Sequence, residues 1–177
     1  MRMAHEGYLE PTTRGFMLPS LTRAEILEVF DLRRLLEPRA AALAALALTG
    51  RQLKELEQAL ADATRAVQIG DVEALFKASE RFRNGWLGVV PNSALRNVIQ
   101  RYMGQVQVVR TMTFKERSNH PVIVTGNSRL YDAFFQRNSV AAADSMLRFV
   151  FEGEAACLAA MSDGNEQPVS KPLGRTA

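Results

Sequence analysis

The sequence predicts an all-α protein, an antiparallel bundle of about six helices with a kinked first helix, preceded by a short β-hairpin-like segment. Apolar residues recur every three or four positions through most of the chain, which is the spacing of one helix face. Residues suited to helix caps stand between these stretches. The 177 residues are 47% hydrophobic and 23% charged, which suits one globular domain with an appendage.

The first expected helix begins at a capping box formed by Thr22 and Glu25. Pro38 falls inside the pattern. Because the apolar periodicity resumes directly after it, we expect the proline to kink this helix rather than end it. The apolar stripe consists of Ile26, Val29, Phe30, Leu36, Ala40, Leu43, Ala44 and Ala47.

Two further helices follow with short connections. Thr49 can cap the second helix, and Gly70 stands in the position expected for its C-terminal end. Asp71 can cap the third helix, which is expected over residues 72–90. The residues expected to face inward are Leu53, Leu56, Leu60, Ala63 and Val67, then Leu75, Phe82, Trp86, Val89 and Val90.

The second half of the chain is also helical in pattern. Asn92 can cap a fourth helix, in which Leu95, Val98, Ile99, Tyr102, Val106 and Val109 share one face. A loop is expected at residues 118–121, a fifth helix at 124–136 and a sixth at 139–160. Residues 162–177 are polar and contain two prolines, so we expect a disordered tail.

The first 20 residues break the helical pattern. Residues 7–18 resemble a strand, a turn and a second strand, and a lone hairpin is marginally stable in water. The hairpin is therefore interpreted as part of a larger fold. No apolar stretch resembles a secretory signal or is long enough to span a membrane. The expected units are residues 1–20, the helical domain at 21–161 and the tail at 162–177.

Four polar residues interrupt the apolar faces of the expected helices: Arg33 in the first, Ser79 and Arg83 in the third, and Asn127 in the fifth. A buried guanidinium needs an acid, carbonyl groups or water beside it. One interpretation is structural, with the arginines reaching solvent or pairing with Glu37, Glu80 or Asp132. The other is a ligand cavity inside the bundle, lined by converging polar groups.

Three segments, taken in order, resemble the FCD domain, the C-terminal effector domain of the FadR subfamily of GntR transcription regulators. They are EILEVFDLRRLLEP at 25–38, RFR at 81–83 and NSAL at 92–95. Family members similarly carry a kinked first helix with Leu-Glu-Pro, a Phe-His pair in the third helix and an Asn-containing start of the next. The resemblance covers residues 21–161 and implies a helical domain that binds a small effector and forms a homodimer.

The chain departs from the family at the metal site. Most members hold a divalent metal with an Asp-x-x-x-His pair and two further histidines. The corresponding positions are Ser79, Arg83, Asn127 and Phe149. Serine and asparagine are poor ligands for zinc-like ions, and arginine repels them. The resemblance therefore predicts a site without metal or other cofactor.

In metal-bearing relatives the cation helps to hold a carboxylate effector. Arg83 would place a permanent cation at the same depth, and a guanidinium can hold a carboxylate through two hydrogen bonds. Arg33 could hold the other end of the ligand, while Trp86 and Phe149 would make the cavity more apolar. The alternative is a degenerate pocket in which Arg83 packs against Glu80 or Asp132.

The first 20 residues also fit the family, because they resemble the wing hairpin of a winged helix-turn-helix domain. Arg14 in this hairpin could contact DNA phosphates, which carry no sequence information. The helices that would read bases are expected upstream of Met1. DNA would therefore be bound only through that N-terminal domain.

Three classes of function follow from these features. The leading one is a ligand-sensing transcription regulator in the cytoplasm, where a single cysteine, Cys157, would remain reduced. The second is a stand-alone ligand-binding or dimerisation module without DNA binding. An enzyme is disfavoured, since the sequence shows no nucleophile motif, phosphate-binding loop or metal cluster, and no paired carboxylates on an apolar face.

Overall fold

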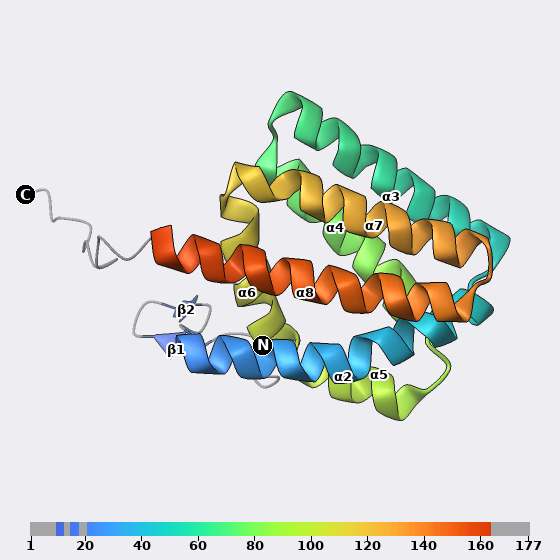
Figure 1. Cartoon of the computed structure of the whole chain (residues 1–177), viewed down its shortest axis with the longest axis horizontal. Helices are drawn as coiled ribbons and strands as arrows, with labels where there is room; N and C mark the ends of the chain where they lie inside the picture. The colour runs from blue at the N-terminus through green and yellow to red at the C-terminus, as the bar shows by residue number, and fades with distance from the viewer. Residues whose placement is uncertain (1–9, 13–14, 18–20, 164–177) are drawn as a thin grey trace, which may run out of the picture.

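Seven α-helices form the bundle in this computed structural model, which describes residues 10–12, 15–17 and 21–163 (Figure 1). Helix α8 (Ser139–Asp163) lies between α2 (Arg23–Ala47) and α7 (His120–Phe135) and runs antiparallel to both. Helix α3 (Gly50–Ile69) packs on α7 and on α4 (Val72–Leu87). Helices α4 and α6 (Met103–Lys115) lie behind this layer, and α5 (Ser93–Arg101) packs on α2.

The predicted caps of the first three helices are confirmed. Thr22 accepts a hydrogen bond from the backbone amide of Glu25, whose carboxylate accepts from the amide of Thr22 at 2.7 Å. Thr49 caps α3 in the same way, and Gly70 ends that helix in the left-handed region at φ 73°. Helix α2 continues through Pro38 as predicted. Local sequence thus determines where these helices begin and end.

The predicted fourth helix is wrong as a single element. The chain turns at Tyr102, whose backbone amide bonds to the carbonyl of Ile99 at 3.2 Å, and α5 and α6 lie on either side of this turn. Helix α5 packs on α2, whereas α6 packs mainly on α8, with further contacts to α2 and α4. One straight helix could not reach both surfaces, although the apolar spacing alone does not show this.

The predicted loop at residues 118–121 is also partly helical. A 3-10 turn, η1 (Arg117–Asn119), leads directly into α7, which begins at His120. Pro121 lies in the first turn of α7, where the missing amide hydrogen would have no helical partner. Helix α8 ends at Asp163, and the remainder of the expected tail lies outside the described residues.

Two short strands precede the bundle. β1 (Glu10–Thr12) pairs antiparallel with β2 (Gly15–Met17), so that Pro11 lies opposite Phe16. Arg14, the expected phosphate contact, falls outside the described residues.

The core of the bundle lies where α2, α4, α7 and α8 meet. Trp86 of α4 and Phe134 of α7 are almost fully buried, with ring centroids 6.1 Å apart. No helix in the described part of the chain is long and apolar enough to cross a membrane.

Candidate functional site

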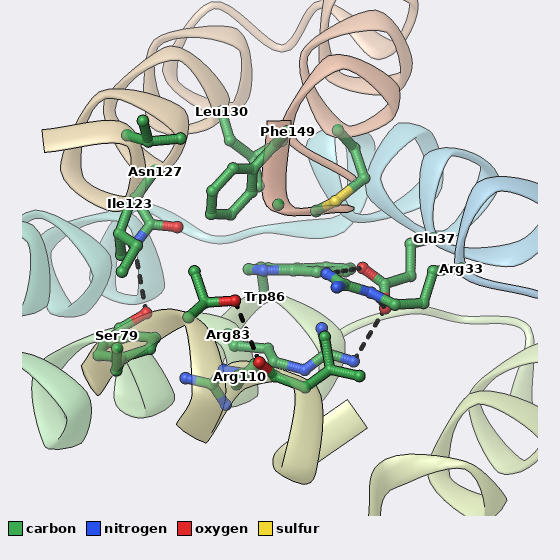
Figure 2. Close-up of a pocket in the computed structure, with 16 residues that line it drawn as sticks. Arg33, Glu37, Ser79, Arg83, Trp86, Arg110, Ile123, Asn127, Leu130 and Phe149 are labelled. Carbon is green, nitrogen blue, oxygen red and sulfur yellow. Dashed lines mark hydrogen bonds and ion pairs between the residues drawn. The ribbon is translucent and has the colours of Figure 1, made fainter. Parts of the chain in front are cut away.

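A cavity of about 60 Å³ lies inside the bundle, between α2, α4, α6, α7 and α8 (Figure 2). This volume can hold a handful of water molecules or a solute of similar size. All six residues expected to contact a ligand line it, although they come from four different helices: Arg33, Ser79, Arg83, Trp86, Asn127 and Phe149. The interrupted apolar faces therefore converge on one space.

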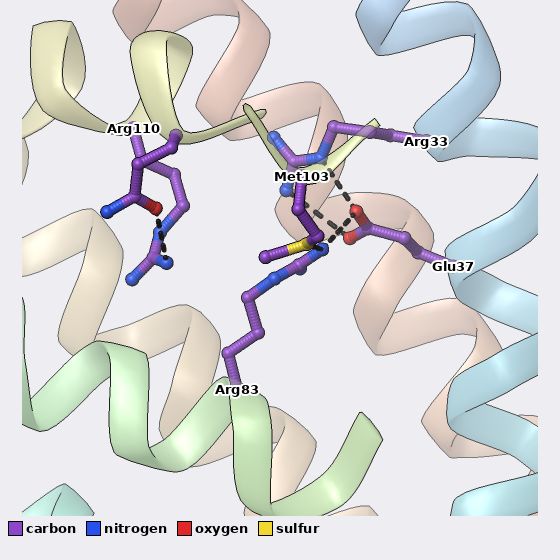
Figure 3. A network of polar contacts seen from close by, with 6 residues as sticks. Arg33, Glu37, Arg83, Met103 and Arg110 are labelled. Carbon is purple, nitrogen blue, oxygen red and sulfur yellow. Dashed lines mark hydrogen bonds and ion pairs between the residues drawn. The ribbon is translucent and has the colours of Figure 1, made fainter. Parts of the chain in front are cut away.

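A buried carboxylate, that of Glu37, joins two of the cavity arginines. Arg33 lies one turn before it on α2 and donates from Nε to Oε1 at 3.0 Å and from Nη2 to Oε2 at 3.3 Å. Arg83 of α4 donates from Nη2 to Oε1 at 3.1 Å (Figure 3). Burial by itself would raise the pKa of Glu37, but the two guanidinium groups lower it to about 2. Glu37 is therefore ionised and fully engaged.

This ion pair matches one of the partners that the structural interpretation offered, because Glu37 pairs with both Arg33 and Arg83. The degenerate pocket in which Arg83 packs against Glu80 or Asp132 is not what the structure shows, since the acidic partner of Arg83 is Glu37. The same Nη2 also contacts the sulfur of Met103 at 3.3 Å. The pairing spans α2 and α4, so its geometry depends on helix packing that the sequence pattern does not contain.

A third arginine, Arg110 of α6, also lines the cavity and was not singled out from the sequence. Only 8% of its surface is exposed, and among the described residues its guanidinium donates one hydrogen bond, from Nη1 to the side-chain oxygen of Gln107 at 3.3 Å. The rings of Phe76 and Phe114 lie 5.2 and 5.6 Å from its guanidinium carbon. Burial, followed by the nearby charge of Arg83, lowers the pKa of Arg110 to about 9.

Two guanidinium nitrogens at the cavity have no hydrogen-bond partner among the described residues: Nε of Arg83 and Nη2 of Arg110. Leaving a buried donor unpaired costs on the order of 1–3 kcal/mol, and more for a charged group. Such donors are suited to binding an anion. Figure 2 shows both side chains at the base of the cavity.

The opposite wall is formed by α7 and α8. The amide of Asn127 faces the hydroxyl of Ser79 at 3.5 Å, which is a long hydrogen bond. The ring of Phe149 lies directly against Gly126, where an added Cβ would meet the ring at 2.2 Å. Gly126 therefore allows Phe149 to sit beside Asn127, and a larger residue would displace the ring.

The signal that identifies Arg33 and Arg83 would also have identified Arg110. Arg110 follows Val106 by four residues and precedes Thr113 by three, so this arginine lies on the buried face of α6. Glu37 likewise follows Arg33 by one helical turn.

Comparison with known proteins identifies the family. The model of the FCD domain matches residues 28–152, well over half of the chain. The chain belongs to the FCD domain family. FCD domains are the effector-binding domains of GntR-family transcription regulators and are regulatory rather than catalytic.

Solved structures agree with this assignment at the level of the fold. The FCD domain is similar to E. coli McbR/YncC with a TM-score of 0.75 and 18% identity, covering 89% of this chain and 80% of that one. It is also similar to Streptococcus agalactiae GntR with a TM-score of 0.58 and 23% identity, covering 87% and 77%. No curated protein matches the sequence.

The family's metal site does not fit the residues present in this FCD domain. Arg83 brings a positive charge that Glu37 already pairs, and Phe149 offers no donor atom. Ser79 and Asn127 contribute only neutral oxygen and nitrogen atoms. Among the described residues, no group of three or more His, Cys, Asp or Glu side chains could hold a metal ion.

Proposed function

We propose that this FCD domain senses a small organic acid, which it binds in the cavity without metal. The observation that carries the proposal is the buried Nε of Arg83, which has no hydrogen-bond partner among the described residues and belongs to a side chain that lines the cavity. A charge-assisted hydrogen bond to a carboxylate would satisfy this donor.

The other cavity residues give the ligand its orientation. Arg33 remains paired with Glu37 and adds positive potential near the carboxylate of the ligand. Ser79 and Asn127 share only one long hydrogen bond, so they retain capacity to bind a polar group of the ligand. Trp86 and Phe149 form apolar walls that exclude water and strengthen the electrostatic attraction.

In the full regulator, effector binding would couple to DNA binding by changing how two subunits are arranged. We propose a homodimer, because reading a two-fold symmetric site on DNA requires two recognition units. Residues 1–20 would be the wing of a winged helix-turn-helix, with Arg14 near phosphate, and such a protein would work in the cytoplasm.

A second candidate is a stand-alone binding or dimerisation module. The DNA upstream of the codon for Met1 distinguishes the two candidates. An in-frame helix-turn-helix there supports the regulator, whereas an in-frame stop codon supports the module.

Substitution of Arg83 tests the binding proposal. Arg83→Ala should lower affinity for carboxylic acids at least about tenfold, because a charge-assisted pair contributes on the order of 1.5–3 kcal/mol. Arg83→Lys should recover little, since an ammonium cannot reproduce the planar fork. Calorimetric titration with a panel of small organic acids measures this.

The control is Arg51→Ala, which removes an arginine whose side chain is 84% exposed, far from the cavity lining. Thermal melts of each variant should show an intact fold, because Glu37 keeps Arg33 as a partner when Arg83 is lost. Unchanged affinity in Arg83→Ala together with a lower melting temperature would refute the proposal and leave Arg83 a structural residue.

A further inference from the structure

The charges that line the cavity do not balance. Arg33, Arg83 and Arg110 contribute three positive charges, and Glu37 contributes one negative charge. Glu80 also acts electrostatically on Arg110, but it does not line the cavity and makes no hydrogen bond to that residue. The lining therefore carries two positive charges in excess.

The excess is concentrated on two donors from two different helices. Glu37 accepts hydrogen bonds from Nε and Nη2 of Arg33 and from Nη2 of Arg83. Nε of Arg83 on α4 and Nη2 of Arg110 on α6 are left without a partner in the described part of the chain. Both side chains are more than nine-tenths buried, so bulk water does not screen them.

From this arrangement we infer that the effector is a dianion on a short skeleton, a small dicarboxylate, with one carboxylate on Arg83 and the other on Arg110. The inference rests on the proposed function and assigns Arg110 as the second anchor. One monocarboxylate could neutralise only half of the excess charge. Two carboxylates would neutralise it completely and satisfy both unpaired donors.

The surroundings of Arg110 support this role. Two aromatic rings and one long hydrogen bond compensate its charge only in part, and burial near Arg83 lowers its pKa. A purely structural arginine would be expected to have an acid or carbonyl groups beside it. The folded protein is therefore less stable than it would be with an apolar residue at position 110, and such a loss of stability is common at binding sites.

A matched pair of ligands isolates the second charge. Succinate and succinamate have the same number of heavy atoms and nearly the same shape, but succinamate carries an amide in place of one carboxylate. Wild-type protein should prefer succinate by at least about tenfold, the effect of one charge-assisted contact. Malonate and malonamate extend the comparison to a shorter skeleton, and inorganic phosphate tests a compact anion.

Arg110→Met should abolish the preference. Methionine fills a similar volume beside the two phenylalanine rings but offers no positive charge. We expect succinate affinity to fall to that of succinamate, while succinamate affinity changes little. The melting temperature of ligand-free Arg110→Met should equal or exceed that of wild type, because a buried charge without an acidic partner is removed.

The outcomes separate this inference from the proposed function. The dicarboxylate inference is wrong if wild type binds succinate and succinamate equally well, or if Arg110→Met still prefers succinate. In either case the proposed binding of a carboxylate remains. Binding of phosphate alone would support a dianionic ligand but would reject an organic acid. No binding of any acid rejects both. A clearly lower melting temperature of Arg110→Met would show that the arginine is structural.

Discussion

At the scale of single residues, the cavity could be recognised in part from the sequence. Arg33, Ser79 and Arg83 stand out because each interrupts an apolar face, and all three line one cavity. Arg110 obeys the same rule on α6. Glu37 was one of three acids that could pair with the arginines, and the choice of Glu37 by Arg83 depends on how α2 and α4 pack.

Glu37 provides a test of this buried network through pH. Its pKa is about 2 in the folded protein, below its ordinary value of 4.5. The carboxylate therefore contributes stability that is fully present above about pH 4.5 and is lost as pH falls toward 2. Glu37→Gln should lower the free energy of unfolding at pH 7 by about 3 to 5 kcal/mol, because it leaves buried arginines without an acid.

Urea unfolding of wild type and Glu37→Gln at pH 7, 5 and 3 measures this contribution. The difference in unfolding free energy should narrow between pH 5 and pH 3. Glu28→Gln, an exposed substitution on the same helix, should show little difference at any pH. A gap between wild type and Glu37→Gln that stays constant with pH would contradict the ionised, doubly paired carboxylate.

At the scale of helices, the sequence predicts a helix end correctly where the residues that form the cap are close together in the chain. The caps at Thr22, Thr49 and Asn92 involve residues three positions apart, and each was predicted correctly. The turn at Tyr102 was missed because it serves packing against helices that are distant in sequence. Pro121 favours a loop when the sequence is considered alone, although a proline is also suited to the first turn of a helix, where the structure places it.

The outer face of α8 carries an apolar stripe suited to a second copy of the chain. Val140, Leu147 and Phe151 are 69%, 36% and 51% exposed and lie seven and four residues apart, on one side of the helix. We expect wild type to sediment at twice 19.6 kDa. Phe151→Glu should shift the equilibrium toward the monomer, since a charge would be buried at the interface.

The control is Ile69→Glu, which alters an apolar residue at the end of α3 that is more exposed than Phe151. It should leave the dimer intact. Analytical ultracentrifugation at micromolar concentration distinguishes the species. A wild type that sediments only as a monomer would refute the homodimer, and a dimer that survives Phe151→Glu would place the interface elsewhere.

At the scale of the whole molecule, three helices bring three arginines and one glutamate around a cavity that five helices line. The family resemblance carried by residues 25–38 indicated the fold and the domain type, and the family match over residues 28–152 agrees. The excess of positive charge appears only when the folded chain is considered. In this account, arginine replaces the metal that most FCD domains use to hold an acid.

Titration of metal-free protein tests directly whether the cavity binds an acid through arginine and without metal. The chain is dialysed against EDTA, its zinc, nickel and manganese content is measured by mass spectrometry, and small carboxylic acids are titrated calorimetrically before and after zinc is added. We expect far less than one metal ion per chain and the same acid affinity in both titrations. Binding that appears only after zinc is added, or near-stoichiometric metal that survives dialysis, would contradict this expectation.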